Sequence, residues 1–169
     1  MRVNDSITVM GVDPGLNSFG YGIISEDARI LHPLKYGQYA VPKSISFNDK
    51  LVYIGKTFSS IIEETRPDFM AIEKIYVAKN TQIALSIGIV SGIIAYTGIS
   101  KGIQVAFITP GEIKKTITGS GQAIKQQVCF MVQKLLGLRE DPGEHAIDAL
   151  ATAICFVSIN RFHNLVGKP

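Results

Sequence analysis

Apolar and polar residues alternate in short runs over the first forty residues, and the spacing then becomes helical. The early runs are separated by turn residues and predict an antiparallel three-strand meander: residues 7–13, 19–25 and 30–41. Two later runs, 69–72 and 103–108, are apolar throughout, which is typical of strands buried on both faces of a parallel sheet. The pattern therefore predicts three strands in hairpin order and two that are separated by longer segments.

Helical spacing fills the intervals around and after the two later strands. The predicted helices are residues 44–66, 80–100, 109–118, 121–136 and 143–159. Thr109 and Pro110 provide the cap and the first-turn proline that favour a helix start. This order predicts an α/β fold with a mixed five-stranded sheet, a three-strand antiparallel meander plus two parallel strands, flanked by helices. We expect one domain over residues 1–160 and a loose tail over 161–169.

Composition is that of a single globular domain. The 169 residues are 46% apolar and 18% charged, which allows a full hydrophobic core and excludes a disordered chain. A net charge of +3 only slightly favours an anionic partner such as nucleic acid. Cys129 and Cys155 lie in helical segments without metal-ligand spacing, so we expect buried thiols in a reducing cytoplasm. Residues 1–6 show no signal-peptide pattern.

Residues 80–100 carry no charge and are long enough to span a bilayer. Ala84, Gly88 and Gly92 recur every four residues, as small residues do in paired membrane helices. The same spacing also suits a helix packed against a sheet or against its twin in a dimer. Because the chain has no second apolar span, we predict a buried helix of a soluble, cytoplasmic protein and no membrane partner.

Two carboxylates directly follow predicted strands, Asp13 after the first and Glu73 after the fourth. If these strands are parallel neighbours, about 4.8 Å apart, both acids emerge at the edge where α/β proteins bind ligands. Two carboxylates so close repel each other unless one is protonated or a cation lies between them. A hard divalent cation is the simpler solution. Each acid taken alone is equally compatible with a solvated strand end.

His145 and Asp148 are three residues apart on the last predicted helix and therefore share a face. A histidine so close to an aspartate is, by itself, most often a local hydrogen-bonded pair. Together with Asp13 and Glu73, however, the two complete a set of three carboxylates and an imidazole. Such a set can hold two ions about 3.5–4 Å apart, which activate water and stabilise the leaving oxygen of a phosphodiester. This interpretation requires Asp13, Glu73 and Asp148 to lie close enough to share an ion.

Three blocks of sequence resemble, in order, the catalytic blocks of the RuvC family of Holliday-junction resolvases, which have an RNase H-like fold. They are Gly-Val-Asp-Pro-Gly at 11–15, Ala-Ile-Glu-Lys-Ile-Tyr-Val-Ala-Lys-Asn at 71–80 and His-Ala-Ile-Asp-Ala-Leu-Ala at 145–151. The resemblance extends from about residue 7 to 160. It implies a homodimeric, Mg²⁺-dependent endonuclease that cuts four-way DNA junctions in homologous recombination and repair. It also implies a partnership with a branch-migration motor of the RuvA and RuvB type.

The resemblance assigns roles to individual residues. It places the ligands of two Mg²⁺ ions at Asp13, Glu73, His145 and Asp148. It also implies contacts with DNA, which we assign to one aromatic residue, to its neighbours in the second block and to three lysines: Tyr76, Lys79, Asn80, Lys114, Lys115 and Lys125. An aromatic ring can stack on an unpaired base, and lysines can neutralise phosphates. Without the resemblance, a core position for the tyrosine and solvated lysines are equally compatible with the sequence.

Two positions depart from the family pattern. His145 stands where many relatives carry aspartate, and imidazole suits Mn²⁺ better than Mg²⁺. We therefore expect Mn²⁺ to substitute for Mg²⁺, and activity to fall below about pH 6.5 as the imidazole is protonated. Ser91 stands where relatives often carry arginine, which removes one DNA or structural contact.

Two alternatives to a junction resolvase stay open from the sequence. One is another RNase H-like nuclease, which would act on RNA–DNA hybrids or in RNA processing. The other is a non-catalytic junction-binding module, although all four candidate ligand positions carry residues that can bind a metal. An actin-like ATPase is excluded because it needs a second lobe, for which the chain is too short.

Overall fold

The structure is a computed structural model that describes residues 6–75 and 81–166. Its strands are β1 (Ile7–Asp13), β2 (Ser18–Asp27), β3 (Ile30–Ala40), β4 (Phe69–Glu73) and β5 (Gln104–Ile108). Its helices are α1 (Phe47–Thr65), α2 (Thr81–Ser100), α3 (Pro110–Thr118), α4 (Lys125–Leu136) and α5 (Glu144–Val166). This order of elements is the one that the sequence predicts. Tyr76, Lys79 and Asn80 lie outside the described residues.

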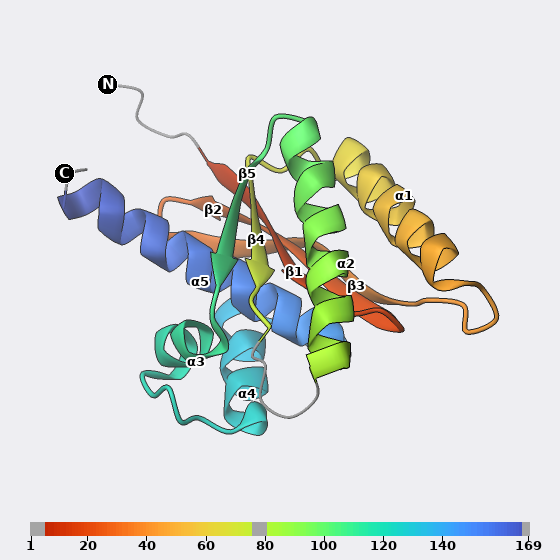
Figure 1. The fold of residues 1–169 in the computed structure, drawn as a ribbon. Coiled ribbons are helices and arrows are strands. Elements are labelled where there is room, and N and C mark those ends of the chain that lie inside the picture. The colour runs from red at the N-terminus through yellow and green to blue at the C-terminus, as the bar shows by residue number, and fades with distance from the viewer. Residues whose placement is uncertain (1–5, 76–80, 167–169) are drawn as a thin grey trace.

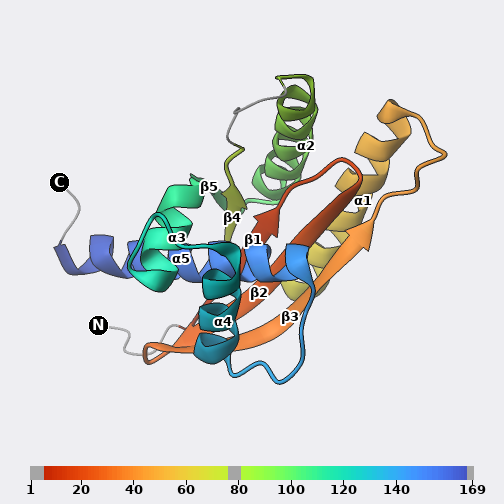
Figure 2. The ribbon, with the colours of Figure 1, turned by 90° about the horizontal axis from the view of Figure 1, so that it is seen from below.

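The five strands form one mixed sheet in the order β3-β2-β1-β4-β5. Strands β1, β2 and β3 pair antiparallel as a meander, whereas β4 pairs parallel with both β1 and β5. Helices α1 and α2 cover one face of this sheet, and α3, α4 and α5 cover the other (Figures 1 and 2). The predicted mixed five-stranded sheet, with its meander and two parallel strands, is therefore confirmed.

Burial on both faces explains the apolar runs of the central strands. Val9 of β1 packs into the core beneath α5, whereas Met10 and Val12 pack into the core beneath α1 and α2. Met70 and Ala71 of β4 divide between the two cores in the same way. Alternate side chains of a strand point to opposite faces, so a strand covered on both sides has to be apolar throughout.

Glycines in β1 and β2 let α5 lie directly on the sheet backbone. A Cβ atom at Gly11 would lie 1.9 Å from the carbonyl oxygen of Ala149, and one at Gly20 would lie 2.0 Å from that of His145. On the helix, Ala146 and Ala149 are fully buried against these strands. The absence of side chains on both surfaces therefore determines how close the start of α5 comes to the end of β1.

Three helix boundaries differ from the predicted ones. Helix α1 begins at Phe47 because the side chain of Ser46 accepts a hydrogen bond from the Asp49 backbone N–H and caps it. Helix α4 begins at Lys125, four residues after Gly121. Helix α5 continues to Val166 rather than ending near residue 159, because no glycine or proline interrupts it before Gly167. The expected tail at 161–169 therefore begins as helix, and residues 167–169 lie outside the described part.

The sequence predicts that helix α2 is buried, and for most of the helix this prediction is wrong. Only 28% of its most apolar 18-residue stretch is buried, through a face that includes Val90, Ile94 and Gly98. Added Cβ atoms at Gly88 and Gly92 would meet no described atom within 4 Å, so these glycines do not pack on the sheet. Within the described part of the chain, α2 is the one helix long and apolar enough to cross a membrane, which on its own is weak evidence. The apolar residues of α2 that this fold leaves exposed therefore form part of the surface of the protein.

Candidate active site

The acids of β1 and β4 emerge at the same edge of the sheet. Val12 is in register with Ile72 across the parallel pair, so Asp13 and Glu73 are the next residues of neighbouring strands. The predicted juxtaposition of these two strand ends is therefore confirmed. The side chain of Asp13 is 18% exposed, so this carboxylate has little access to water.

His145, in the first turn of α5, is held by three strands. Its Nδ1 atom lies 2.6 Å from Oδ2 of Asp13 on β1, and its Nε2 atom lies 2.7 Å from Oγ of Ser18 on β2. Its backbone N–H donates a hydrogen bond of 3.3 Å to Oε1 of Gln38 on β3. His145 therefore contacts Asp13, one member of the predicted set, rather than forming the local pair with Asp148 that its spacing alone would suggest, because α5 starts directly over the end of β1.

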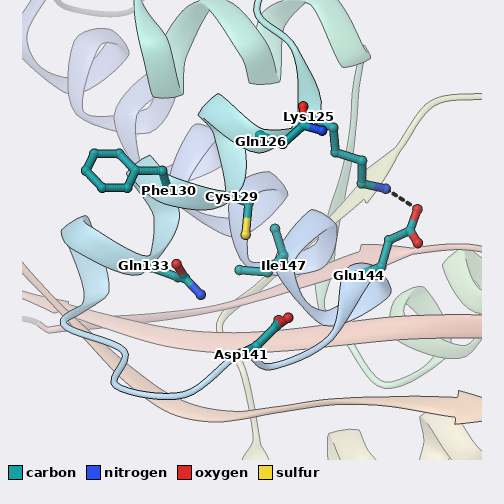
Figure 3. Close-up of a pocket in the computed structure, with 8 residues that line it drawn as sticks. All are labelled: Lys125, Gln126, Cys129, Phe130, Gln133, Asp141, Glu144 and Ile147. Atoms are coloured by element: carbon teal, nitrogen blue, oxygen red, sulfur yellow. Dashed lines mark hydrogen bonds and ion pairs between the residues drawn. The ribbon is translucent and has the colours of Figure 1, made fainter.

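Asp148 lies one turn further along α5 and is paired with a lysine. Lys125, the first residue of α4, places Nζ 2.9 Å from Oδ2 of Asp148. The same ammonium group forms an ion pair with Glu144, which Figure 3 shows as a dashed line. Burial lowers the pKa of Lys125, but the hydrogen bonds to Glu144 and Asp148 outweigh it and the pKa is raised. Lys125 is therefore a fixed cation at the border of the acidic cluster.

Negative charge at this edge exceeds what the protein neutralises. Burial, followed by the charges of Asp13 and Asp148, raises the pKa of Glu73 to about 8. Burial also raises the pKa of Asp13; the hydrogen bond with His145 opposes this rise, and the charge of Asp148 adds to it. The charges of Lys125 and Lys114 lower the pKa of Glu73 but do not restore its usual value. The three carboxyls therefore repel one another, and a further cation would relieve this repulsion.

The donor set fits a divalent cation by its chemistry, although its side chains are not arranged around one. Among residues 6–75 and 81–166, no three His, Cys, Asp or Glu side chains converge closely enough to hold an ion. Asp13 is turned toward His145, and Asp148 toward Lys125, as carboxylates do when a protein group is the nearest cation or donor. Oxygen-rich sites with excess negative charge suit hard divalent ions. The expectation that Asp13, Glu73 and Asp148 share one ion is therefore not met by the side-chain positions of the described residues, although the backbone places Asp13 and Glu73 at the same edge.

A cavity of about 220 Å³ opens between this acidic edge and helices α3 and α4. Two acids, Glu73 and Asp148, and two lysines, Lys114 and Lys125, line it. Lys115 is exposed and is not among the described residues that line this cavity. Four lysines were expected to contact DNA: two of them border this cavity, Lys115 does not, and Lys79 lies outside the described residues.

A second cavity of about 390 Å³ is lined by the Lys125–Glu144 pair (Figure 3), and Lys125 also lines the first cavity. Cys129 and Ile147 form part of its apolar wall, and Asp141 and Gln133 are polar groups at its margin. Both cysteines are free thiols; Cys155 is buried, as expected, whereas Cys129 is partly exposed. The catalytic candidates Asp13 and Glu73 do not line this second cavity, so its chemistry differs from that of the acidic edge.

Three polar contacts of this site were not predicted from the sequence. Ser18 and Gln38 hold His145, and Glu144 holds Lys125. Ser18 and Gly20 are two residues apart on β2 and therefore lie on the same face of the strand. This spacing is the one sequence signal that could have indicated the contact of Ser18 with His145. Gln38 and Glu144 carry no such signal, since a polar residue on an edge strand or a first helical turn is ordinary.

Comparison with known proteins gives a consistent result. The family described as "Crossover junction endodeoxyribonuclease RuvC" matches residues 9–156. The protein of that name from Oleidesulfovibrio alaskensis is 38% identical over 161 residues, which cover 95% of this chain and 96% of the relative. The one from Lawsonia intracellularis is 37% identical over 162 residues, with 96% of each chain covered.

A solved structure agrees with this result. Thermus thermophilus RuvC in complex with a Holliday junction substrate matches with a TM-score of 0.86 and 25% sequence identity, over 92% of this chain and 96% of the other. The family match spans the three elements that carry Asp13, Glu73, His145 and Asp148.

Proposed function

Because the chain belongs to the RuvC family of crossover junction endodeoxyribonucleases, we propose that it resolves four-way (Holliday) DNA junctions by metal-dependent hydrolysis of phosphodiester bonds. The observation that carries this proposal is the group of four potential ligands at one edge of the sheet. Asp13, Glu73, His145 and Asp148 come from three separate elements at this edge; His145 contacts Asp13, and Glu73 and Asp148 line a cavity that two lysines also line. Such a group is costly to maintain unless it binds a cation.

Each residue has a defined role in the proposed mechanism. Asp13, Glu73 and Asp148 would hold divalent cations, expected to be two Mg²⁺ ions, and His145 would complete the set. When bound, the ions supply the acidity that activates water and the charge that stabilises the departing oxygen. Lys114 and Lys125 line the same cavity as Glu73 and would bind the scissile phosphate and its neighbour.

Paired cleavage of a junction needs two active sites, and helix α2 offers a surface for a homodimer. Leu85, Ile89, Tyr96 and Ile99 are 40–71% exposed, and their spacing of four, seven and three residues follows a heptad pattern with Gly92 inside it. This pattern is that of helices that pair along an apolar seam. We infer that two copies of the chain pair through α2.

Two narrower proposals follow from the family and not from the site. We propose that the enzyme acts in the cytoplasm, in homologous recombination and repair, with a branch-migration motor of the RuvA and RuvB type.

The alternatives of a hybrid-specific or RNA-processing nuclease and of a non-catalytic junction-binding module fit less well. A non-catalytic module has no need for a buried Glu73 beside Asp13 and Asp148, where burial and the charges of these two acids raise its pKa to about 8.

A cleavage experiment tests the proposed function directly. Wild-type protein is incubated with a synthetic four-way junction, a linear duplex and an RNA–DNA hybrid, with Mg²⁺, with Mn²⁺ and with EDTA. We expect symmetric nicks in the junction with either metal, relatively stronger with Mn²⁺ because of His145, and none with EDTA. Asp13→Asn should be inactive, whereas Asp27→Asn, at the exposed opposite end of β2, should cut normally. Equal rates for wild type and Asp13→Asn, or a preference for the hybrid, would overturn the proposal.

A further inference from the structure

Both ring nitrogens of His145 have partners, and these partners differ in kind. Asp13, at Nδ1, is a carboxylate that accepts hydrogen bonds when ionised. Ser18, at Nε2, is a hydroxyl that can either donate or accept. Neither contact is fully open to water, since the imidazole side chain is 35% exposed and that of Asp13 is 18% exposed. The position of the single proton on a neutral imidazole is therefore set by these two neighbours.

Metal-free and metal-bound states require this proton on different nitrogens. Without a metal, ionised Asp13 accepts from Nδ1–H, and Ser18 donates its hydroxyl hydrogen to Nε2. If Asp13 and His145 share a cation, the nitrogen that faces Asp13 has to present a lone pair, so the proton lies on Nε2. A metal-ligating histidine donates from its other nitrogen to an acceptor, and here the available acceptor is Oγ of Ser18.

We propose that Ser18 is a positioning residue that lets His145 exchange tautomers, so that Nδ1 ligates the cation while Nε2–H donates to the Ser18 hydroxyl. The inference rests on the proposed metal site. In the exchange, Nδ1 releases a proton to water and Nε2 takes one from water, so no net charge is gained or lost. The Ser18 hydroxyl rotates from donor to acceptor. Alanine can do neither, whereas threonine carries the same hydroxyl and can do both.

The fold holds Ser18 and His145 in fixed positions for this exchange. Ser18 pairs with Ala40 at the start of β2 and lies on the same strand face as Gly20. The missing side chain of Gly20 leaves room for the His145 backbone, which Gln38 also holds through the N–H group. Because both backbones are fixed, a rotation of one hydroxyl is a smaller change than a movement of the ring.

The test reads the tautomer directly by ¹⁵N NMR of labelled histidine rings at about pH 8, where a free imidazole is neutral. The chain has three histidines, and the His145 signals are assigned by their loss in His145→Gln. In wild type we expect Nδ1–H without metal and Nε2–H at saturating Mg²⁺. The same titration gives the dissociation constant of Mg²⁺. It should rise about tenfold in Ser18→Ala and stay within about twofold in Ser18→Thr, because removal of an outer-shell partner of a ligand costs about 10–100-fold.

The outcomes separate this inference from the proposed function. If wild type binds Mg²⁺ and cuts junctions while His145 keeps its proton on Nδ1, or while Ser18→Ala binds Mg²⁺ as tightly as wild type, the Ser18 inference is wrong and the proposed function stands. If wild type neither binds Mg²⁺ nor cuts junctions, both are wrong. Circular dichroism of Ser18→Ala verifies that a loss of affinity is not a loss of fold.

Discussion

Replacing Glu73 with glutamine should stabilise the metal-free protein near neutral pH and abolish its cleavage activity. Burial and the charges of Asp13 and Asp148 raise the pKa of the Glu73 carboxyl from 4.5 to about 8 in the folded protein. The ionised form is therefore disfavoured by folding. Glutamine removes the charge, keeps the shape of the side chain and cannot serve as an anionic metal ligand.

The sign and size of the effect follow from proton linkage. The folded protein keeps the Glu73 proton up to about pH 8, whereas the unfolded chain releases it near 4.5, so the free energy of unfolding falls as the pH rises between these values. At about 1.4 kcal/mol per pH unit, the loss at pH 7 amounts to about 3 kcal/mol. The repulsion is shared with Asp13 and Asp148, so the substitution relieves only part of this loss. Glu73→Gln should therefore raise the free energy of unfolding by about 2 kcal/mol at pH 7 and by little at pH 5.

The assay is urea unfolding in EDTA at pH 5 and pH 7. It is followed by circular dichroism because the chain contains no tryptophan. Asp27→Asn is the matched control, since it removes a carboxylate from an exposed site at the far end of β2. Mg²⁺ should reverse the ranking, because a cation that binds only the folded wild type stabilises it and not the variant.

Two results would refute this reasoning. One is a Glu73→Gln variant that is no more stable than wild type at pH 7. The other is a gain of the same size at both pH values, which would indicate better packing rather than relief of charge repulsion.

Three further predictions concern the packing, the DNA surface and the dimer. Gly11→Ala should destabilise the protein by about 3 kcal/mol or more, because its Cβ would lie 1.9 Å from a carbonyl oxygen of α5. Gly111→Ala, whose Cβ would have no described atom within 4 Å, should be neutral in the same urea assay. Equal stabilities of the two variants would contradict the close packing. Lys125→Met should weaken junction binding and reduce the slope of log affinity against log salt by about one, and Lys56→Met on the opposite face should not; an unchanged slope would exclude a phosphate contact. If two copies pair through α2 as proposed, wild type should sediment as a dimer and Leu85→Glu as a monomer that has lost paired cutting; a dimeric variant would exclude the α2 seam.

Much of the site could be predicted from the sequence because its main residues interrupt regular patterns. Asp13 and Glu73 each end an apolar run, and a run of that kind identifies a strand buried on both faces. His145 and Asp148 are placed on one helix face by their spacing alone. These local patterns were sufficient for the order of elements and for the edge that carries Asp13 and Glu73, whereas the ligand roles of the four residues stay predictions.

The tertiary structure decided which of these residues touch. The spacing put His145 and Asp148 on one helix face but did not show which groups they contact; the imidazole faces Asp13 and Ser18, and Asp148 faces Lys125. The sequence likewise predicted a buried α2, whereas the sheet and α1 cover only one of its faces. Contacts between residues more than a hundred positions apart depend on how closely two backbones approach. Here that approach is set by glycines of β1 and β2, and the position of a glycine in the chain does not tell which distant helix will pack against it.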